Sequence, residues 1–405
     1  MSMSMITTDA TRPWSLETPF RTDYLVFGKP DIQEPEINEV LAALRSGWIG
    51  TGPRAAKFER QFAEYVSTPS AVAVNSCTAA LHLALVVMGV RPGDEVIVPA
   101  MTFASTANVV IHAGGRPVFA DVKRDTMCID PDEIARLATS RTRAVIPVHF
   151  AGRAAEMTQI LDQASQHKLC VIEDCAHAIE TTYSGRHAGT FGDLGAFSFY
   201  ATKNVVTGEG GMITTSNPAL SERLRTLRLH GLSGDAWRRY SDDGFKHYEI
   251  VEPGFKYNMM DLQAALGIHQ LARVESNLKR RQQIWARYDE AFADLPAILP
   301  AAEEPGTRHA RHLYTLMLDL DRLTTHRDAI QLALHRQRIG TGIHYRALNL
   351  HPYYRDTFGY HTGQFANAEW ISERTLSLPL STAMTDGDVD DVVFAVAHTL
   401  KHFTR

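Results

Sequence analysis

Long apolar runs and an excess of positive charge are both absent from this sequence of 405 residues. No apolar stretch reaches the roughly 18 residues that a membrane-spanning helix needs, so we expect no contact with a membrane. The formal net charge is −5 and no basic face is evident, which argues against binding to nucleic acid. The first residues also lack the basic and then apolar pattern of a secretory signal. These absences predict a globular protein of the cytoplasm.

Cysteine is scarce as well, and its spacing argues against two kinds of site. The four cysteines, Cys77, Cys128, Cys170 and Cys175, include no C-x-x-C pair. We therefore expect neither a metal site nor a disulfide framework, but reduced thiols in the core. The sequence also lacks the glycine-rich fingerprints G-x-x-x-x-G-K-[ST] and G-x-G-x-x-G. This argues against a P-loop and against a dinucleotide-binding turn.

What the sequence does contain is a regular alternation of short strands and helices. Runs of valine, isoleucine and alanine, such as "SAVAV" and "DEVIVPA", are each followed by a helical segment. Strands that are continuously apolar are typical of sheets covered on both faces. The order of elements therefore predicts an α/β fold, with a mostly parallel central sheet flanked by helices and wound by right-handed crossovers.

The pattern changes after the segment "GGMITTSNP", which suggests how the chain is divided. A loop rich in glycine, aspartate and arginine spans roughly 231–257, and a long helical stretch follows it. From about residue 300 the sequence indicates a smaller α+β unit that ends in an amphipathic helix. We therefore expect an N-terminal arm over 1–24, a large α/β domain over 25–265, and a connecting long helix with a small C-terminal α+β domain over 266–405.

Two short segments carry groups suited to a charged ligand. Asp174 comes at the carboxyl end of a predicted buried strand, where ligands of open α/β sheets bind. A buried carboxylate is costly unless a cation lies opposite it, although a turn or helix cap is the more usual role of such an aspartate. Residues 76–79, Ser-Cys-Thr-Ala, begin a predicted helix. Its free N–H groups could bind an anion or could simply be capped.

Lys203 directly follows the strand-like run "FSFYAT", which is an unusual place for a lysine. Solvent exposure at a strand end is the ordinary fate of such a residue. Its alternative role is that of a Schiff-base amine, since an apolar wall lowers the cost, about 4–5 kcal/mol at pH 7, of removing its proton. The glycines of "GEGG" at 208–211 either form a hairpin turn or let the backbone approach a ligand. An anion-binding turn, an orphan carboxylate and a half-buried lysine together fit pyridoxal phosphate.

Five segments of the chain occur in a characteristic order: "NSCTAALHLAL", "PAMTFASTANVV", "VIEDCAHA", "FSFYATKN…GEGG" and "PGFKYNMMDLQAA". In these, the chain resembles the DegT/DnrJ/StrS family of pyridoxal-phosphate-dependent sugar aminotransferases, from about residue 25 to the C-terminus. It is most similar to the UDP-4-amino-4-deoxy-L-arabinose aminotransferase type, through "VIPVHFAG", "RLHGLSGDAW" and "IGTGIHYRALNLHPYYRDTF". The resemblance implies the fold type I aminotransferase architecture, which agrees with the alternation of elements.

The resemblance also implies roles for individual residues. Lys203 would be the catalytic lysine that forms the Schiff base and moves the proton, while Asp174 would pair with the ring nitrogen and His177 would lie beside the ring. The other expected cofactor-binding residues of the same chain are Cys77, Thr78, Ala79, Phe103 and Ser198. In this family the site is shared across a homodimer, so Lys256 or Asn258 should reach the partner's phosphate site. The commoner family pattern there is Gly-aromatic-Asn-Tyr-Arg, from which both residues depart.

The implied reaction is a two-step transamination. An amino-acid donor, L-glutamate by resemblance, leaves its amine on the cofactor, and a nucleotide-linked keto-sugar then accepts it, at C4 by the same resemblance. The candidate sugar-binding residues are Trp48, Gly50, Thr51, His344, Tyr345 and Arg346. The glycines of "SGWIGTGP" at 46–53 could equally form a plain turn, and His344 could be a structural histidine, while an arginine or a histidine would suit a diphosphate.

Other activities are compatible with part of these motifs. Amino transfer at C3 of a keto-sugar, or to a cyclitol ketone, would use the same cofactor site. A pyridoxal-phosphate-dependent deoxy-sugar dehydratase of this family carries a histidine in place of the lysine, so Lys203 argues against it. A cofactor-binding regulator without turnover is disfavoured by the intact lysine, aspartate and phosphate-binding turn.

Overall fold

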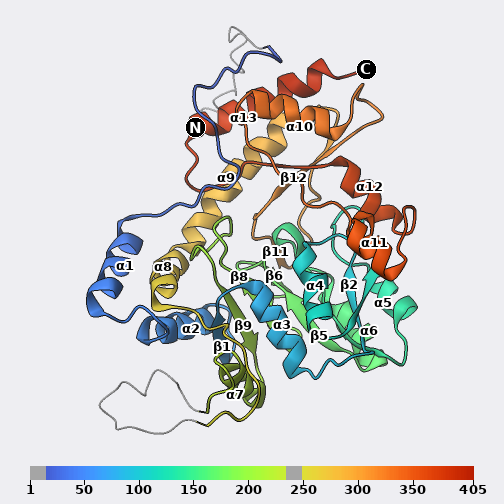
Figure 1. Cartoon of the computed structure of the whole chain (residues 1–405). Coiled ribbons are helices and arrows are strands. Elements are labelled where there is room, and N and C mark those ends of the chain that lie inside the picture. Colours follow the sequence, from blue (N-terminus) through green and yellow to red (C-terminus); the bar gives the residue numbers. More distant parts are fainter. Residues whose placement is uncertain (1–14, 234–248) are drawn as a thin grey trace.

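The computed structural model describes residues 15–233 and 249–405. The first part of the expected N-terminal arm, the middle of the expected 231–257 loop and the end of "RLHGLSGDAW" lie outside these residues. Two units stand out, a large one around a seven-stranded sheet and a smaller one at the C-terminal end of the chain (Figure 1). Within the described ranges, no helix combines the length and the apolar composition that crossing a membrane requires.

The large sheet has the strand order β1-β9-β8-β5-β4-β2-β3. Its strands are β1 (Ser70–Val74), β2 (Glu95–Pro99), β3 (Arg116–Ala120), β4 (Thr142–Val145), β5 (Cys170–Asp174), β8 (Leu194–Ser198) and β9 (Gly211–Thr215). Only β9 runs antiparallel to its neighbours, while the other adjacent strands are parallel. The predicted mostly parallel α/β sheet is therefore confirmed.

Helices cover both faces of this sheet, which is why its strands are apolar throughout. On one face α3 (Cys77–Val87) contacts α4 (Ala104–His112), and on the other α5 (Pro131–Leu137) contacts α6 (Met157–His167), as right-handed crossovers require for this strand order. The helix α7 (Pro218–Leu227) packs beside α3. The helices α1 (Glu34–Ser46), α2 (Pro53–Tyr65) and α8 (Asp261–Ala272) form a side layer next to β1 (Figure 1). There Phe58 and Phe62 of α2 pack against Phe199.

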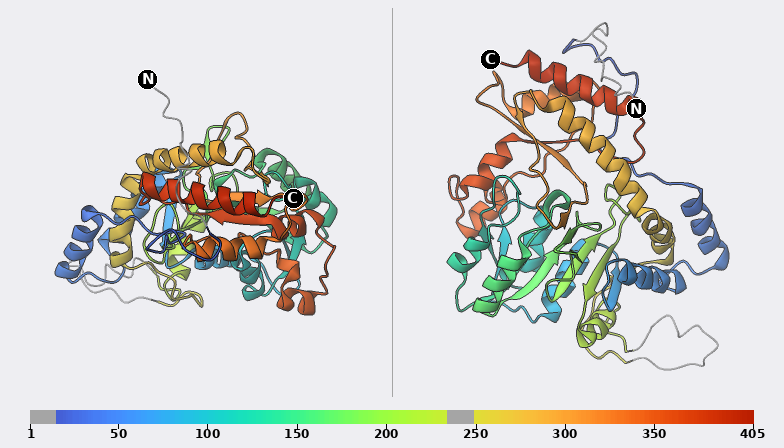
Figure 2. Two further views of the ribbon diagram at one scale, coloured as in Figure 1. Left: turned by 90° about the horizontal axis from the view of Figure 1, so that it is seen from above. Right: turned by 180° about the vertical axis from the view of Figure 1, so that it is seen from behind.

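The smaller unit is built around a three-stranded antiparallel sheet. Its strands are β10 (Ala297–Ile298), β12 (Tyr314–Leu318) and β13 (Thr375–Leu378), and its helices are α9 (Val274–Phe292), α10 (Arg327–Arg336) and α13 (Asp386–His402). Tyr288 and Phe292 of α9 pack on Tyr314 in its core. The view from behind shows α9 continuing from α8 towards α13 (Figure 2). A further small sheet joins β11 (Thr307–Arg308) to β6 (Thr182–Tyr183) and β7 (Arg186–His187).

Two segments pack against a unit other than the one next to them in the sequence. The helices α11 (Pro352–Phe358) and α12 (Ala366–Arg374) lie against the large sheet, where Tyr354 and Phe365 contact Phe119 of β3. This segment therefore packs with the large unit, although the sequence suggested the small C-terminal domain for it. Arg21 of the N-terminal arm instead pairs with Asp388 and Asp391 of α13.

Candidate active site

One edge of the large sheet brings together the carboxyl ends of the parallel strands β1, β2, β5 and β8. The antiparallel strand β9 begins at the same edge. A cavity of about 470 Å³ opens there, a volume ordinary for a small-molecule site. Its lining consists of Ser76, Cys77, Thr78, Thr102, Phe103, Ser105, Val148, Asp174, Ala176, His177, Ser198, Tyr200, Thr202, Lys203, Glu209, Gly210, His344 and Tyr345.

Most of the residues expected at the cofactor line this cavity. From the expected set, it brings together Cys77, Thr78, Phe103, Asp174, His177, Ser198, Lys203, His344 and Tyr345. Those that do not line it are Ala79, Lys256, Asn258, Trp48, Gly50, Thr51 and Arg346. The side chains of Asn258 and Thr51 lie together instead, with 2.6 Å between Asn258 Nδ2 and Thr51 Oγ1. Lys256 and Arg346 are exposed.

Lys203 enters the cavity from a turn that follows β8. Its backbone N–H donates to the carbonyl oxygen of Tyr200 at 2.8 Å, and its side chain is half-buried. Burial lowers the pKa of Lys203 to about 8, although Cys77 and Asp174 oppose this shift. At pH 7 about a tenth of such a lysine is free amine, against well under a thousandth at the ordinary pKa. The geometry therefore supplies a nucleophilic amine near neutral pH.

Asp174 is a buried carboxylate that makes no ion pair within the described residues. It is 4% exposed, and it accepts hydrogen bonds from the backbone N–H of Ala176 at 3.1 Å and from the hydroxyl of Thr106 at 2.9 Å. Burial raises the pKa of Asp174, while these hydrogen bonds and Lys203 oppose the rise. No ion pair involves Asp174 within residues 15–233 and 249–405. A buried carboxylate in this state, at the wall of a cavity, fits the protonated ring nitrogen of pyridoxal phosphate.

The turn between β1 and α3 has donors suited to a phosphate. Ser76 caps α3, because its Oγ accepts the N–H of Ala79 at 3.1 Å. The N–H of Ala80 donates to the carbonyl oxygen of Ser76. This leaves the N–H groups of Cys77 and Thr78 unpaired in the described part of the chain, beside the positive end of the helix dipole. Among the expected phosphate ligands, Ala79 has its backbone N–H engaged by Ser76, while Thr78 lines the cavity.

Gly211 lets β9 pass directly against this turn. A Cβ added to Gly211 would lie 2.5 Å from the carbonyl carbon of Ser76 and 2.7 Å from the nitrogen of Cys77. Gly211→Ala should therefore displace the turn, lower the free energy of unfolding by about 1–3 kcal/mol and weaken retention of the cofactor. Urea unfolding and cofactor release on dialysis measure the two effects.

A glycine in an open position provides the control for this variant. A Cβ added to Gly387 of α13 would meet its nearest neighbour only at 3.7 Å. Gly387→Ala should leave cofactor retention unchanged. Equal retention in Gly211→Ala and the unaltered protein would show that the close approach of β9 does not shape the turn.

Aromatic and imidazole rings form another wall of the cavity. The ring centroids of Phe103 and Tyr345 lie 5.9 Å apart. Nδ1 of His177 accepts the N–H of Ala151, so its Nε2 carries the hydrogen and donates to the hydroxyl of Tyr345 at 3.3 Å. Burial and the charge of Lys203 lower the pKa of His344 to about 4. A neutral His344 offers a hydrogen bond to a ligand but no positive charge for a diphosphate.

Three residues that matter for this geometry gave no sufficient signal in the sequence. Thr106 lies one helical turn after Thr102, and the two hydroxyls are 3.0 Å apart. Helical spacing of the two threonines was the one available clue. His312 and Asn204 contact each other, and His312 also contacts Lys203, 109 positions away in the chain. No local sequence pattern predicts a contact between residues as distant in sequence as Lys203 and His312.

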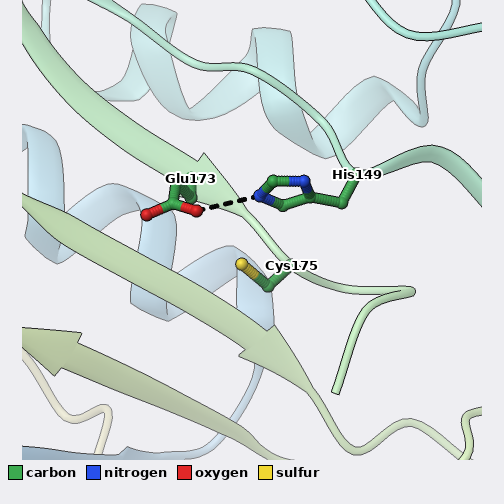
Figure 3. A group of neighbouring side chains, drawn as sticks. All are labelled: His149, Glu173 and Cys175. Carbon is green, nitrogen blue, oxygen red and sulfur yellow. Dashed lines mark hydrogen bonds and ion pairs between the residues drawn. The ribbon is translucent and has the colours of Figure 1, made fainter. Parts of the chain in front are cut away.

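Behind the cavity, His149, Glu173 and Cys175 form a buried cluster (Figure 3). Glu173 accepts three backbone N–H groups of residues 189–192 at 2.7–2.8 Å and the Nε2–H of His149 at 2.9 Å. Nδ1 of His149 accepts the N–H of Ala155 at 3.1 Å. Because four donors occupy the carboxylate and both ring nitrogens are used, the cluster holds the end of β5 in place rather than offering ligands to a metal ion.

Comparison with known proteins gives close matches over nearly the whole chain. Residues 30–397 match the DegT/DnrJ/EryC1/StrS aminotransferase family. An uncharacterised protein of Methanocaldococcus jannaschii is 49% identical over 376 residues, which cover 93% of this chain and 97% of that protein. The spore coat polysaccharide biosynthesis protein SpsC of Bacillus subtilis is 49% identical over 382 residues, 94% of this chain and 98% of that protein.

Solved structures give the same result in three dimensions. The chain matches Spr1654 of Streptococcus pneumoniae, described as a sugar aminotransferase, in its PMP form with a TM-score of 0.88 and 35% identity, covering 93% of this chain and 99% of that one. The PLP form of the same protein matches with a TM-score of 0.87 and 34% identity, over 94% and 99% of the two chains. Pyridoxal phosphate and pyridoxamine phosphate are thus both recorded on this architecture.

Proposed function

Because the chain belongs to the DegT/DnrJ/EryC1/StrS aminotransferase family, and is therefore a pyridoxal-phosphate-dependent transaminase, we propose that it transfers the amino group of L-glutamate to C4 of a nucleotide-linked keto-sugar. The observation that carries the proposal is the meeting of Lys203, Asp174 and the α3 turn in one cavity. The naming of SpsC for polysaccharide biosynthesis supports a sugar acceptor. We place the reaction in the cytoplasm, where reducing conditions keep thiols such as its four free cysteines unpaired.

The residues of the cavity would have different roles in the reaction. When bound, pyridoxal phosphate supplies an electron sink for the carbon that gains or loses the amine. The N–H groups of Cys77 and Thr78, with the hydroxyl of Ser198, hold its phosphate. The carboxylate of Asp174 holds a proton on the ring nitrogen. Nζ of Lys203 would move a proton between the substrate carbon and the cofactor carbon in each half of the reaction, as base and then as acid.

A second copy of the chain is proposed to complete the site. Phe103 and Tyr200 line the cavity, yet they are 59% and 47% exposed in one chain. On α1, Ile37, Leu41 and Leu44 form an exposed apolar stripe, with exposures of 43%, 40% and 52%. The exposed apolar stripe of α1 and the exposed aromatic rings in the cavity lining support a homodimer in which the partner covers apolar surface of both kinds.

The partner is proposed to reach the phosphate through Lys256 rather than Asn258. The amide nitrogen of Asn258 already donates to Thr51 at 2.6 Å. Lys256 is exposed, and its ammonium makes no ion pair in the portion of the chain that the structure describes. A free cationic donor suits a phosphate better than an amide whose N–H is engaged.

The acceptor is tested by a half-reaction. The protein is converted to its amine form with L-glutamate, freed of donor, and exposed in turn to nucleotide-linked 4-keto-sugars, nucleotide-linked 3-keto-sugars and cyclitol ketones. Return of the visible absorbance of lysine-bound cofactor marks the acceptor. A response to 3-keto-sugars or cyclitol ketones alone would overturn the C4 assignment, and L-glutamate that fails to convert the protein would overturn the donor.

Mixing two defective variants tests the shared site. Lys203→Ala removes the amine from one site, and Lys256→Ala should weaken phosphate binding in the partner's site. If a site is built from two chains, mixed dimers contain one intact site, and activity after co-refolding exceeds that of either variant alone. No gain on mixing would show that each site is built from one chain. Full activity of Lys256→Ala would show that Lys256 is not a phosphate ligand.

A further inference from the structure

The amine of Lys203 has a neighbour that the reaction described above does not use. Nε2 of His312 lies 3.5 Å from Nζ of Lys203. His312 lies two residues before the start of β12 in the small unit and is 6% exposed. The lysine of the large unit is thus contacted by an imidazole from the other unit.

The hydrogen-bond partners of Asn204 determine which nitrogen of His312 carries the hydrogen. Asn204 Nδ2 lies 2.8 Å from a carboxylate oxygen of Glu180 and 3.0 Å from the carbonyl oxygen of Ala310. Both partners can only accept, so the amide nitrogen faces them and the amide oxygen faces the other way. That oxygen lies 2.9 Å from Nδ1 of His312. Nδ1 of His312 must therefore donate, which leaves a lone pair on Nε2 directed at Lys203.

A buried ion pair anchors this arrangement. Glu180 is fully buried and pairs with Arg281 of α9, which is 3% exposed. The second carboxylate oxygen of Glu180 accepts the amide hydrogen of Asn204. The amine of Lys203 is thus the end of a chain of contacts between four buried or half-buried side chains, which runs from Arg281 through Glu180 and Asn204 to His312.

His312 stays neutral in these surroundings. Burial lowers the pKa of His312 well below its ordinary value, and four charged or titratable neighbours lower it further: Lys203, His177, His344 and Arg281. The ring of His177 lies 4.5 Å from that of His312, centroid to centroid. The remaining groups that face the amine of Lys203 are Cys77 and Asp174. A neutral imidazole with a fixed hydrogen on Nδ1 can act towards Lys203 only as an acceptor.

We propose that His312 is a positioning residue for Lys203: locked by Asn204 with its hydrogen on Nδ1, it accepts a hydrogen from Nζ, orients the amine and stabilises the ammonium formed each time Lys203 takes up a proton. This inference rests on the proposed role of Lys203 as the lysine that moves the proton. The bond needs no further reactant, since the proton stays on Nζ throughout.

The test measures Lys203 itself in cofactor-free protein. Acetic anhydride labels free amines, and peptide mass spectrometry gives the extent of labelling of Lys203 at each pH. In the unaltered protein, labelling should be half-maximal near pH 8. His312→Phe removes the acceptor and disfavours the ammonium, so the midpoint should fall by about one pH unit. His312→Gln keeps an acceptor oxygen near the position of Nε2 and should restore the midpoint.

Two further variants keep the test decisive. His309, at 4% exposure, is as buried as His312, but its Nδ1 accepts the N–H of Arg311 and its ring contacts Trp285, with 5.2 Å between the ring centroids. His309→Phe should leave the Lys203 midpoint unchanged. Asn204→Leu releases the ring of His312 and should shift the labelling midpoint of Lys203 in the same direction as His312→Phe. If His312→Phe does not fold, Asn204→Leu tests the proposal in its place.

The proposal is overturned if His312→Phe and Asn204→Leu both label as the unaltered protein does. In the loaded enzyme, His312→Phe should lower kcat about tenfold with little change in KM, and His312→Gln should recover most of it. Failure of the role of Lys203 has a different signature, because Lys203→Ala would then remain active while the labelling shifts persisted.

Discussion

Lys203→Ala should lower amino transfer about 10⁴-fold, the upper end of what a positioned acid–base group contributes. The variant removes the amine, with its pKa of about 8, that is proposed to move the proton. It should also lose the visible absorbance of lysine-bound cofactor while still binding pyridoxal phosphate through the α3 turn. The measurements are kcat for L-glutamate with the accepted keto-sugar, and the absorption spectrum after loading.

A control and a rescue make this result specific. Lys123 pairs with Glu156 outside the cavity, so Lys123→Ala should keep full activity. Small alkyl amines added to Lys203→Ala should restore part of the rate, because they can occupy the space of the missing side chain. Near-normal turnover of Lys203→Ala without added amine would refute the assignment of the catalytic lysine.

Lys203 should also change how the free energy of unfolding depends on pH. Its folded pKa of about 8 lies below its ordinary value of 10.5, so between these pH values the unfolded chain binds more protons than the folded one. The free energy of unfolding of cofactor-free protein should therefore gain a contribution as pH rises from 8 to 10.5. Lys203→Met should abolish that contribution, which paired urea titrations across this range would detect.

Asp174→Asn should be the second large effect: activity falls about 10²–10³-fold while the cofactor-free protein becomes no less stable. The carboxylate lines the cavity and makes no ion pair in the described part of the chain, so the bound ring nitrogen would be its ionic partner. Losing one member of a buried ion pair costs about 3–5 kcal/mol. The amide keeps the acceptor oxygen for the N–H of Ala176, and its NH2 group takes the place of the oxygen that accepts the Thr106 hydroxyl, which can turn to accept instead.

The stability part of this prediction has a definite sign. Burial raises the pKa of Asp174 above its unfolded value, so the folded state is penalised at pH values above that value and the penalty disappears in acid. Cofactor-free Asp174→Asn should therefore unfold at a higher urea concentration than the unaltered protein at pH 7, and the difference should shrink as pH falls towards 4.

A second partly buried aspartate serves as the control. Asp289 accepts a hydrogen bond from the hydroxyl of Tyr314 in the small unit, and burial raises its pKa as well. Asp289→Asn should leave kcat unchanged because it lies away from the cavity. If Asp174→Asn also kept its kcat, Asp174 would be a turn residue and not a partner of the cofactor.

The fold and the centre of the site could be predicted because both rest on local pattern. Continuous apolar strands alternating with helices imply a covered parallel sheet, and the carboxyl ends of such strands meet at one edge. Asp174 ends one such strand, Lys203 follows a second and residues 76–79 follow a third, so their meeting required only the sheet. The order of strands, and hence which of these ends are adjacent, was not contained in the pattern.

The surroundings of the amine were decided by tertiary structure alone. Asn204 is the residue after Lys203, but its role depends on Glu180, Ala310 and His312, which reach it from both units. A side-chain amide and an imidazole have no orientation in a sequence, because their hydrogens are placed only by the partners that surround them. The sequence by itself thus determined that a lysine and a carboxylate share the edge of a parallel sheet. Only the packing of the small unit against that edge decided which nitrogen of His312 faces the amine.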